Sequence, residues 1–520
     1  SIIGQENSFN EAWLLYKGFN EASSYLWISY ALSDDEGNGR EPAPLLRWVR
    51  RLLPEVKLWQ ILQSDGFVAE GHQAVSGLGK ALGRCRDLGA MEDKWYGVYN
   101  WLVQHSDQGL AHSLALLQQG LSSKRGDDAL PADLSRKLFA PKGWLRGSVT
   151  RLERYNSCPF QYYVQYGLKL QERRISEFSN PELGTLLHGV LREFGQELKN
   201  QNRRWSDVSE AEQRQMCHEI LHRLAPKLGN NVIFQRKQLE ARLRRIENTA
   251  AFALQRLCAF DAVSQLHPEY FEEGFGSMAK DANQRALSLV YKLSSGNKLS
   301  LNGQIDRIDM TEDGRYFMVM DYKTGNAAIN IMDVYYGIKL QLLTYLLVTK
   351  QFLSAQQGEE ALPVGMLYYF LKQPRASLAS HGESQQEVIA ALEKKLLMPG
   401  WIVADKELVQ LIDSTLSQPG AKSRFIHATM KKGGDLMANA TYLRQPRELE
   451  LLLEYVEELL QHTGRDILAG RIAPVPYRNR EGHSTCEYCN YRAICGFDAQ
   501  LEGFGYRRVV QQGDKEFMEN

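Results

Sequence analysis

Three of the seven cysteines lie close together near the end of the chain, in the segment TCEYCNYRAIC (485–495). Their spacing is C-x2-C-x5-C, and a tetrahedral thiolate site needs a fourth ligand. Four other cysteines could supply it, namely Cys85, Cys158, Cys217 and Cys258. Cys158 precedes a proline, which predicts an extended backbone there, whereas Cys217 and Cys258 lie in apolar helical segments typical of core thiols. Four thiolates can hold either zinc or an iron–sulfur cluster.

A second set of reactive residues surrounds Asp313-Gly314. The flanking segments LSLNGQIDRIDM (299–310) and RYFMVMDYKTG (315–325) read as strands, and Asp-Gly between them predicts a two-residue hairpin turn. In that register Asp306 faces Asp321. Their β-carbons would lie about 5 Å apart, so the two carboxylates would repel unless a divalent cation lay between them. Oxygen ligands in an open site favour Mg²⁺ or Mn²⁺.

Lys323 lies two residues after Asp321 and therefore on the same face of the strand. Two carboxylates with a metal and an ammonium group on one face can position a water and stabilise charge on a scissile phosphate. This is the chemistry of phosphodiester hydrolysis. The alternative is a surface salt bridge between Asp321 and Lys323. The apolar run YFMVM before Asp321 argues against it, because such a run is typical of a buried central strand.

The elements that position these residues change in character at about residue 146. Residues 1–145 read as mostly helical. Beyond them the apolar periodicity predicts helices within 148–168, 179–198, 206–266, 339–350 and 447–470, and strands at 287–295, 299–310, 315–325 and 364–371. The first three strands follow one another directly and are expected to form a meander. His188, Gln341 and Tyr345 lie on predicted helices, the last two on one face, and alone they would indicate nothing.

Composition limits the class of protein. The chain has 520 residues, 43% hydrophobic and 24% charged, as in ordinary globular proteins. Its formal net charge is zero, so any DNA-binding surface must be a local patch. The candidate phosphate contacts are Arg146, Arg151, Arg154, Lys169 and Arg307. Sparse cysteines argue against a secreted disulfide scaffold, no signal peptide is visible, and the longest apolar run, 340–348, is too short to span a bilayer. A cytoplasmic protein with no membrane partner is expected.

The segments GQIDRID and MDYKTG, with LGTLLHGVL upstream and QLLTY downstream, resemble in type and order the catalytic core of RecB-like PD-(D/E)XK nucleases. The sequence departs from the family name because isoleucine, not proline, precedes Asp306. The resemblance implies an α/β fold with a mixed central sheet flanked by helices. It implies His188, Asp306, Asp321 and the carbonyl of Tyr322 as metal ligands, Lys323 as the catalytic lysine, and Gln341 and Tyr345 as residues that orient the substrate or the metal-bound water.

The segment SCPFQYYVQYGL (157–168), together with the C-terminal C-x2-C-x5-C, resembles the iron staple of the B subunits of AddAB-type helicase–nucleases. This resemblance implies that Cys158, Cys486, Cys489 and Cys495 hold a 4Fe–4S cluster; from the residues alone, Zn²⁺ is the alternative. It covers residues 146–505 as the nuclease domain and leaves 506–520 as a tail. Residues 1–145 resemble the end of the helicase-like portion. No G-x4-G-K-[ST] phosphate loop is found, as expected for a C-terminal part.

The function implied by the resemblance is a metal-dependent DNA exonuclease domain that acts on single strands or duplex ends. Its partner would be an AddA-type helicase–nuclease subunit, in a heterodimer that processes double-strand breaks for recombinational repair. One alternative is an inactive nuclease-fold subunit that only grips DNA, against which the intact Asp306, Asp321 and Lys323 argue. The other is a stand-alone RecB-like exonuclease, for which the chain is too long.

Overall fold

The computed structural model describes residues 13–32, 41–42, 44–56, 70–89, 91–105, 107–122, 129–170, 180–227, 237–276, 289–293, 296–325, 327–374, 391–479, 481–499 and 503–507. It divides into two compact units, Ser1–Ser123 and Lys124–Asn520. The division lies earlier than the expected boundary after residue 145, because helix α6 (Ala132–Phe139) belongs to the second unit. The hydroxyl of Ser135 on α6 donates to the carbonyl of Ile467 at 2.6 Å. Of the expected tail, residues 508–520 lie outside the described residues.

The first unit is mostly helical in its described part, as expected. A helix at residues 13–20 is followed by α2 (Pro44–Leu52), α3 (Gly71–Leu88), α4 (Asp93–His105) and α5 (Gln108–Ser122). The last three pack together around a small core that includes Leu78, Trp95, Leu102 and Leu114. Gly77 permits this contact, since a β-carbon there would come within 2.3 Å of the Trp95 ring.

The second unit is built on a mixed eight-stranded sheet in the order β1-β4-β5-β6-β7-β8, with β2 and β3 also paired to β4. The strands are β1 (Trp144–Ser148), β2 (His267–Phe275), β3 (Leu289–Lys292), β4 (Lys298–Met310), β5 (Tyr316–Lys323), β6 (Leu362–Phe370), β7 (Gly400–Val403) and β8 (Leu443–Arg444). The pairs β1–β4, β5–β6 and β7–β8 are parallel and the others antiparallel. The predicted mixed sheet and the β3–β4–β5 meander are therefore confirmed.

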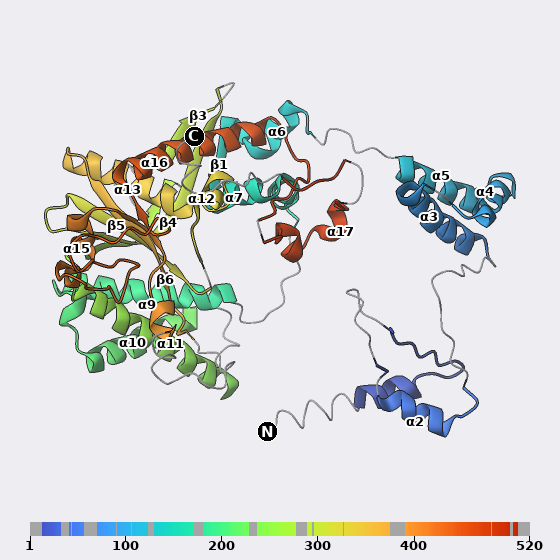
Figure 1. The fold of residues 1–520 in the computed structure, drawn as a ribbon, viewed down its shortest axis with the longest axis horizontal. Helices are drawn as coiled ribbons and strands as arrows, with labels where there is room; N and C mark the ends of the chain where they lie inside the picture. The colour runs from blue at the N-terminus through green and yellow to red at the C-terminus, as the bar shows by residue number, and fades with distance from the viewer. Residues whose placement is uncertain are drawn as a thin grey trace. The chain divides into compact units, whose positions relative to one another are not determined.

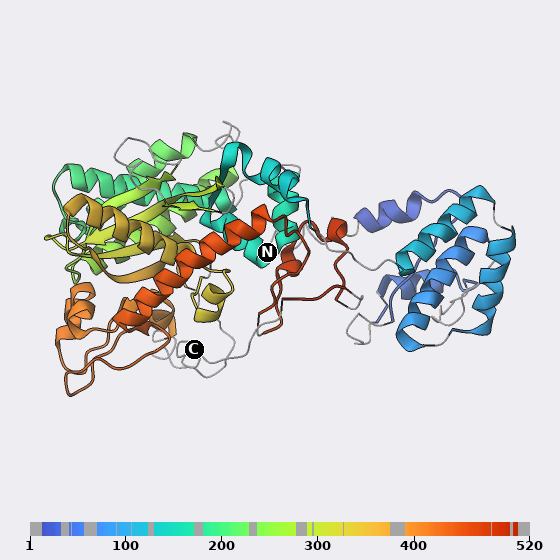
Figure 2. The same ribbon diagram turned by 90° about the horizontal axis from the view of Figure 1, so that it is seen from above.

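Helices cover the sheet on both sides (Figures 1 and 2). One layer contains α7 (Val149–Ser157), α13 (Gln341–Gln357) and α16 (Pro446–Leu468), and the other contains α9 (Asn180–Asn200), α10 (Glu210–Leu224) and α11 (Lys237–Asp261). Shorter helices are α8 (Pro159–Tyr162), α12 (Ile331–Tyr335), α15 (Lys406–Ile412) and α17 (Arg492–Cys495). Among the described residues, none of the helices is long and apolar enough to cross a bilayer.

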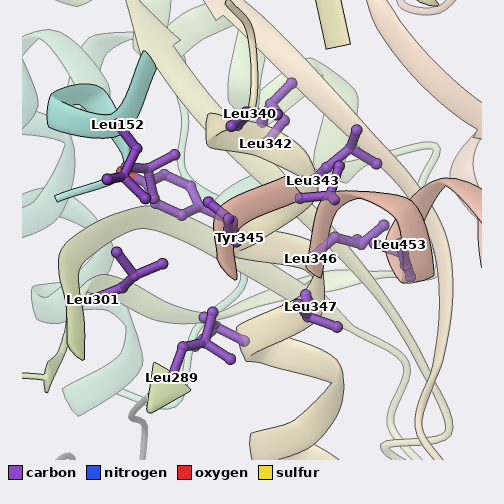
Figure 3. Packing of buried hydrophobic residues seen from close by; sticks show 14 of the residues in the cluster. Leu152, Leu289, Leu301, Leu340, Leu342, Leu343, Tyr345, Leu346, Leu347 and Leu453 are labelled. Atoms are coloured by element: carbon purple, nitrogen blue, oxygen red, sulfur yellow. The ribbon is translucent and has the colours of Figure 1, made fainter. Parts of the chain in front are cut away.

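Strand β5 is buried on both faces, which confirms that it is a central strand. Phe317 and Val319 belong to the apolar cluster under α7, α13 and α16, whereas Met318 and Met320 belong to the cluster under α9 to α11. This alternation follows from the two-residue period of a strand. Figure 3 shows the first cluster, in which the leucines of α13 pack against Leu152 of α7, Leu301 of β4 and Leu453 of α16.

The hairpin between β4 and β5 keeps the predicted register but not the predicted turn. Ile308 pairs with Val319, as expected. The strands, however, are joined by a longer loop, 311–315, in which the N–H of Gly314 donates to the carbonyl of Thr311 at 2.9 Å. The prediction of a two-residue turn is wrong. The register survives because the longer loop is centred on the same Asp-Gly pair, with the glycine at a φ of +72° that suits glycine.

Candidate active site

The two predicted carboxylates lie where β4 and β5 separate. The ladder of paired residues ends at Arg307 and Met320, so Asp306 and Asp321 lie one step beyond it. There the carboxylate of Asp306 accepts the backbone N–H of Tyr322 at 2.7 Å. Beyond the end of the ladder, Asp306 therefore reaches across to the backbone of β5.

Lys323 and Gln341 complete the polar surroundings of Asp321. The ammonium of Lys323 forms an ion pair with Asp321 and donates to Gln341 Oε1 at 3.1 Å. The amide of Gln341 donates to Asp321 Oδ1 and to the hydroxyl of Tyr345, each at 2.9 Å. The Asp321 side chain is 2% exposed and that of Lys323 29%. The pair is therefore not a surface salt bridge, and its lysine end is partly exposed to solvent.

His188 reaches the same carboxylates from α9. Its Nδ1 lies 3.2 Å from Asp306 Oδ1, and its ring packs edge-on against the ring of Tyr322, with centroids 5.6 Å apart. Gly184 lies one turn earlier, and Thr324 comes within 3.8 Å of the place where a β-carbon would be. Helix α9 thus runs close to the end of β5.

The carboxylates strongly affect the protonation of the site. Burial and the nearby charge of Asp306 raise the pKa of Asp321 to about 7, although Lys323 opposes the shift. Burial lowers the pKa of His188, but its hydrogen bond to Asp306 and the negative charges nearby outweigh burial and raise it overall. Near neutral pH the Asp321 carboxyl is therefore close to the midpoint of its protonation, and a bound cation would favour its charged form.

Most of the candidate donors are the oxygens that hard divalent cations prefer, namely two carboxylates and the backbone carbonyl of Tyr322, and the imidazole of His188 is the one nitrogen donor. The ligand atoms of His188, Asp306 and Asp321 do not all lie within 4.8 Å of one another. A shared ion would require small side-chain rotations that separate Asp306 from His188 and Asp321 from Lys323. In donor type, the residues fit Mg²⁺ or Mn²⁺.

Sequence reasoning missed Glu153 on α7. Its carboxylate accepts the N–H groups of Leu340 at 2.6 Å and Gln341 at 3.0 Å, at the start of α13. Burial raises the pKa of Glu153, while these N–H groups and the charges of Lys339 and Lys323 oppose the shift. Glu153 therefore fixes the helix end that carries Gln341. The only signal in the sequence is that Glu153 is the single acidic residue of its helix, VTRLERYNS.

Arg307 cannot contact DNA, and that prediction is wrong. Its side chain is 0% exposed and donates to both oxygens of Asp309, at 2.6 and 2.8 Å. Its guanidinium carbon lies 4.9 Å from the centroid of the Trp205 ring. The other four candidates are accessible to different degrees: Arg146 and Lys169 are exposed, and Arg151 and Arg154 are half-buried.

The four predicted cysteine ligands line one cavity, although Cys158 is far from the others in sequence. The cavity walls include Cys158, Cys486, Cys489 and Cys495. Cys158 ends α7 in an extended conformation (φ −164°, ψ 111°), as predicted. Beside it, the carbonyl of Ser157 accepts the N–H of Tyr477 at 2.8 Å. This contact joins the end of α7 to the segment that leads to the other three cysteines.

The spacing of the thiols bears on the metal. No three of the four sulfur atoms lie within 4.8 Å of one another. A Zn–S bond of about 2.3 Å in a tetrahedral site requires sulfurs about 3.8 Å apart, so the cysteine side chains would have to rotate to enclose a zinc ion. Burial raises the pKa of Cys158 to about 11. The predicted inert thiols, Cys217 and Cys258, lie buried in the core under α9 to α11.

The family follows from this geometry and from comparison with known proteins. Residues 146–496 match the family model of the PD-(D/E)XK nuclease superfamily. This match covers well over half of the chain, and the chain belongs to that superfamily.

The relatives are more particular. The chain is similar to proteins named as the B subunit of an ATP-dependent helicase/deoxyribonuclease. It is 30% identical to that of Desulforamulus reducens, over 98% of this chain and 43% of the relative. It is 29% identical to that of Pelotomaculum thermopropionicum (98% and 44%) and 30% identical to that of Clostridium perfringens (98% and 44%). The chain therefore spans less than half the length of these relatives.

Proposed function

We propose that this chain is the nuclease-bearing part of a helicase–nuclease B subunit and that it hydrolyses phosphodiester bonds in DNA. The observation that carries the proposal is the contact network of Asp321, Lys323 and Gln341 beside Asp306. A partly exposed lysine held against a buried carboxylate suits phosphate chemistry better than structural stability. The name and the extent of the relatives support the assignment to such a complex, since they align with residues before 146 as well.

Each residue has a distinct role in this proposal. Asp306, Asp321, His188 and the carbonyl of Tyr322 would hold Mg²⁺ or Mn²⁺, which when bound polarises the phosphate and lowers the pKa of a water. Lys323 would place a positive charge where negative charge develops on the phosphate. Gln341 forms hydrogen bonds with both Asp321 and Lys323 and would hold the two side chains in position. The hydroxyl of Tyr345 would fix the orientation of the Gln341 amide.

The proposed substrate and partner are supported by the family and by the names of the relatives. We propose an exonuclease that acts on a DNA single strand or duplex end in the cytoplasm. Its partner would be an AddA-type helicase–nuclease subunit, in a complex that processes double-strand breaks for recombinational repair. Arg146 and Lys169 are exposed and would track phosphates.

The cysteine cavity would hold a 4Fe–4S cluster. Four thiolates suit either metal, and the resemblance of these cysteines to the iron staple of AddAB-type B subunits favours the cluster. The backbone N–H of Phe497 donates to Cys495 Sγ at 3.4 Å, a hydrogen bond of the kind that tunes such clusters. Zn²⁺ is the alternative that metal analysis would distinguish.

The test is cleavage of end-labelled DNA, as single strand and as duplex, by the purified protein with Mg²⁺ and with EDTA. The proposal predicts progressive shortening from an end with Mg²⁺, none with EDTA, and none with Asp321→Asn. Glu312→Gln, a change to an exposed carboxylate in the same hairpin, should cleave like the wild type. Equal cleavage by wild type and Asp321→Asn would refute the assignment. Binding without any cleavage would favour the inactive scaffold.

A further inference from the structure

A third cluster of metal-ligating side chains lies outside both sites described above. It consists of His218 and His222 on α10 and Glu247 on α11. The Nδ1 of His218 lies 3.0 Å from Glu247 Oε1, and the two imidazole rings have centroids 4.2 Å apart. One ligand atom from each residue can be chosen so that all three lie within 4.8 Å of one another. Among the described residues, this is the one group of three histidine, cysteine or acidic side chains that meets that limit.

Packing of the two helices fixes the backbone that presents these groups. His218 and His222 are four residues apart and therefore share one face of α10. Next to them, Cys217 is fully buried, and its Sγ lies 3.9 Å from the carbonyl of Glu247. Ile246, beside Glu247, is buried in the same cluster. The helix faces cannot shift easily, whereas the three side chains lie at the surface and can rotate.

We propose that His218, His222 and Glu247 form a binding site for a borderline divalent cation of the zinc class. Zinc bonds to imidazole nitrogen and carboxylate oxygen are about 2.0–2.2 Å long, so ligand atoms in a tetrahedral site lie about 3.4 Å apart. The His218–Glu247 pair already meets this spacing, and His222 needs a small rotation. Three protein ligands leave the fourth position to water.

The ligands also indicate which cation would bind. Two imidazoles favour Zn²⁺, Ni²⁺ or Cu²⁺ over Mg²⁺, which prefers oxygen. The site should therefore discriminate against the ion proposed for the nuclease centre. Because its ligands come from two helices, a bound ion would link α10 to α11 and stabilise the layer that also contains α9 and His188.

The experiment is a calorimetric titration of the purified protein with Zn²⁺ in the presence of excess Mg²⁺. The protein keeps whatever metal its cysteine site contains on purification. His222→Ala loses one of the three ligands. It should therefore bind one equivalent of Zn²⁺ fewer than the wild type, or bind that equivalent at least about tenfold more weakly. His462→Ala changes another exposed histidine, paired with Asp466 in α16, and should bind like the wild type.

A second readout separates a site between helices from loose surface binding. Zn²⁺ should raise the melting temperature of the wild type and of His462→Ala. The rise should be smaller for His222→Ala and for Glu247→Gln. Circular dichroism without Zn²⁺ would check that the variants fold. Identical Zn²⁺ stoichiometry and affinity in wild type and His222→Ala would overturn the proposal. A Zn²⁺-dependent stabilisation unchanged in both variants would do so as well.

Discussion

At the scale of single residues, Lys323 is the side chain whose proposed role is purely electrostatic. Its ammonium contacts Asp321 and Gln341, and Lys323→Ala would remove charge without removing a metal ligand. Loss of a positioned charge of this kind costs about 10²–10³ in rate, so we expect that loss in single-turnover cleavage with DNA affinity little changed. Lys350→Ala, which removes a lysine paired with Glu360 at 2.7 Å, is the matched control. Wild-type cleavage by Lys323→Ala would contradict the role.

The buried pair Arg307–Asp309 gives a prediction about stability rather than activity. Asp309→Ala would leave a fully buried guanidinium without its carboxylate, and breaking such a pair costs about 3–5 kcal/mol. Urea unfolding followed by tryptophan fluorescence would measure it. Glu312→Gln, which weakens the exposed pair with Arg204, should change little, since exposed ion pairs contribute little. A similarly small loss in both variants would mean that Arg307 is not enclosed.

Sequence spacing correctly brings together those site residues whose partners lie nearby in the same hairpin. Asp306, Asp321 and Lys323 follow from strand alternation and one turn, because the register depends on the position of Asp-Gly rather than on the turn type. Arg307 is misassigned by such reasoning because β4 is covered on both faces, so a charged residue beside the site can point into a core. Glu153 is missed because its partners are backbone N–H groups at Leu340 and Gln341, far along the chain.

At the scale of elements, α9 gives a matched pair of glycines. A β-carbon at Gly195 would come within 2.4 Å of the Phe271 ring of β2, whereas at Gly184 the nearest atom is 3.8 Å away. Gly195→Ala should therefore destabilise by about 1–3 kcal/mol through overpacking. Gly184→Ala should be neutral or stabilise by up to about 1 kcal/mol, because alanine favours the helix. Equal melting temperatures would contradict the close packing of α9 on β2.

Glu153 should act through the start of α13. Glu153→Ala removes the acceptor of two backbone N–H groups, so Gln341 would lose its fixed position. We expect a fall in kcat with little change in KM, because the substrate need not touch Glu153. Glu153→Gln keeps one acceptor oxygen and should recover part of the rate. If both variants match the wild type in kcat while folding normally, the link from α7 to the site does not operate.

Periodicity predicts the long elements and fails on the short ones. Helices α9 and α16 and strand β4 repeat their apolar residues over enough positions to be read, whereas α13 and β5 are read from their apolar runs. Strands β7 and β8 have only four and two residues, which is too few for a period of two to appear. Strand β2, HPEYFEEGF, is half-buried along most of its length and carries three glutamates. It escapes prediction because its partner β4, rather than its own composition, makes it a strand.

At the scale of the whole molecule, a metal held by the four cysteines would connect distant parts of the second unit, Lys124–Asn520. A metal shared by Cys158 and Cys486 would close a loop of about 330 residues. The cross-link entropy formula gives about 6 kcal/mol for such a loop as an upper bound. Cys158→Ser should therefore lose iron and labile sulfide, melt at a lower temperature and bind DNA less well. Cys217→Ser, at a core thiol, is the control for metal content and should keep its iron.

Two results would contradict this closure. A colourless wild type with one zinc and no iron would refute the cluster but keep the cross-link. A Cys158→Ser protein with full metal content and unchanged melting would refute both.

The extent of the second unit, Lys124–Asn520, can be predicted only roughly from the sequence. Residues 129–145 contain helix α6 and the start of strand β1, which belong to this unit by packing. The backbone N–H of Leu130 donates to the carbonyl of Gly470 at 2.8 Å, a contact that no local pattern reveals.

The central claim is that Asp306 and Asp321 together hold a divalent cation, and Mn²⁺ binding tests it most directly. Electron paramagnetic resonance would count free Mn²⁺ during a titration of wild type, Asp306→Asn, Asp321→Asn and the control Glu312→Gln. Each aspartate change keeps the side-chain shape but removes a charged ligand, so its affinity should fall by at least about tenfold. Glu312→Gln should bind like the wild type. Unchanged Mn²⁺ affinity in both aspartate variants would contradict the account.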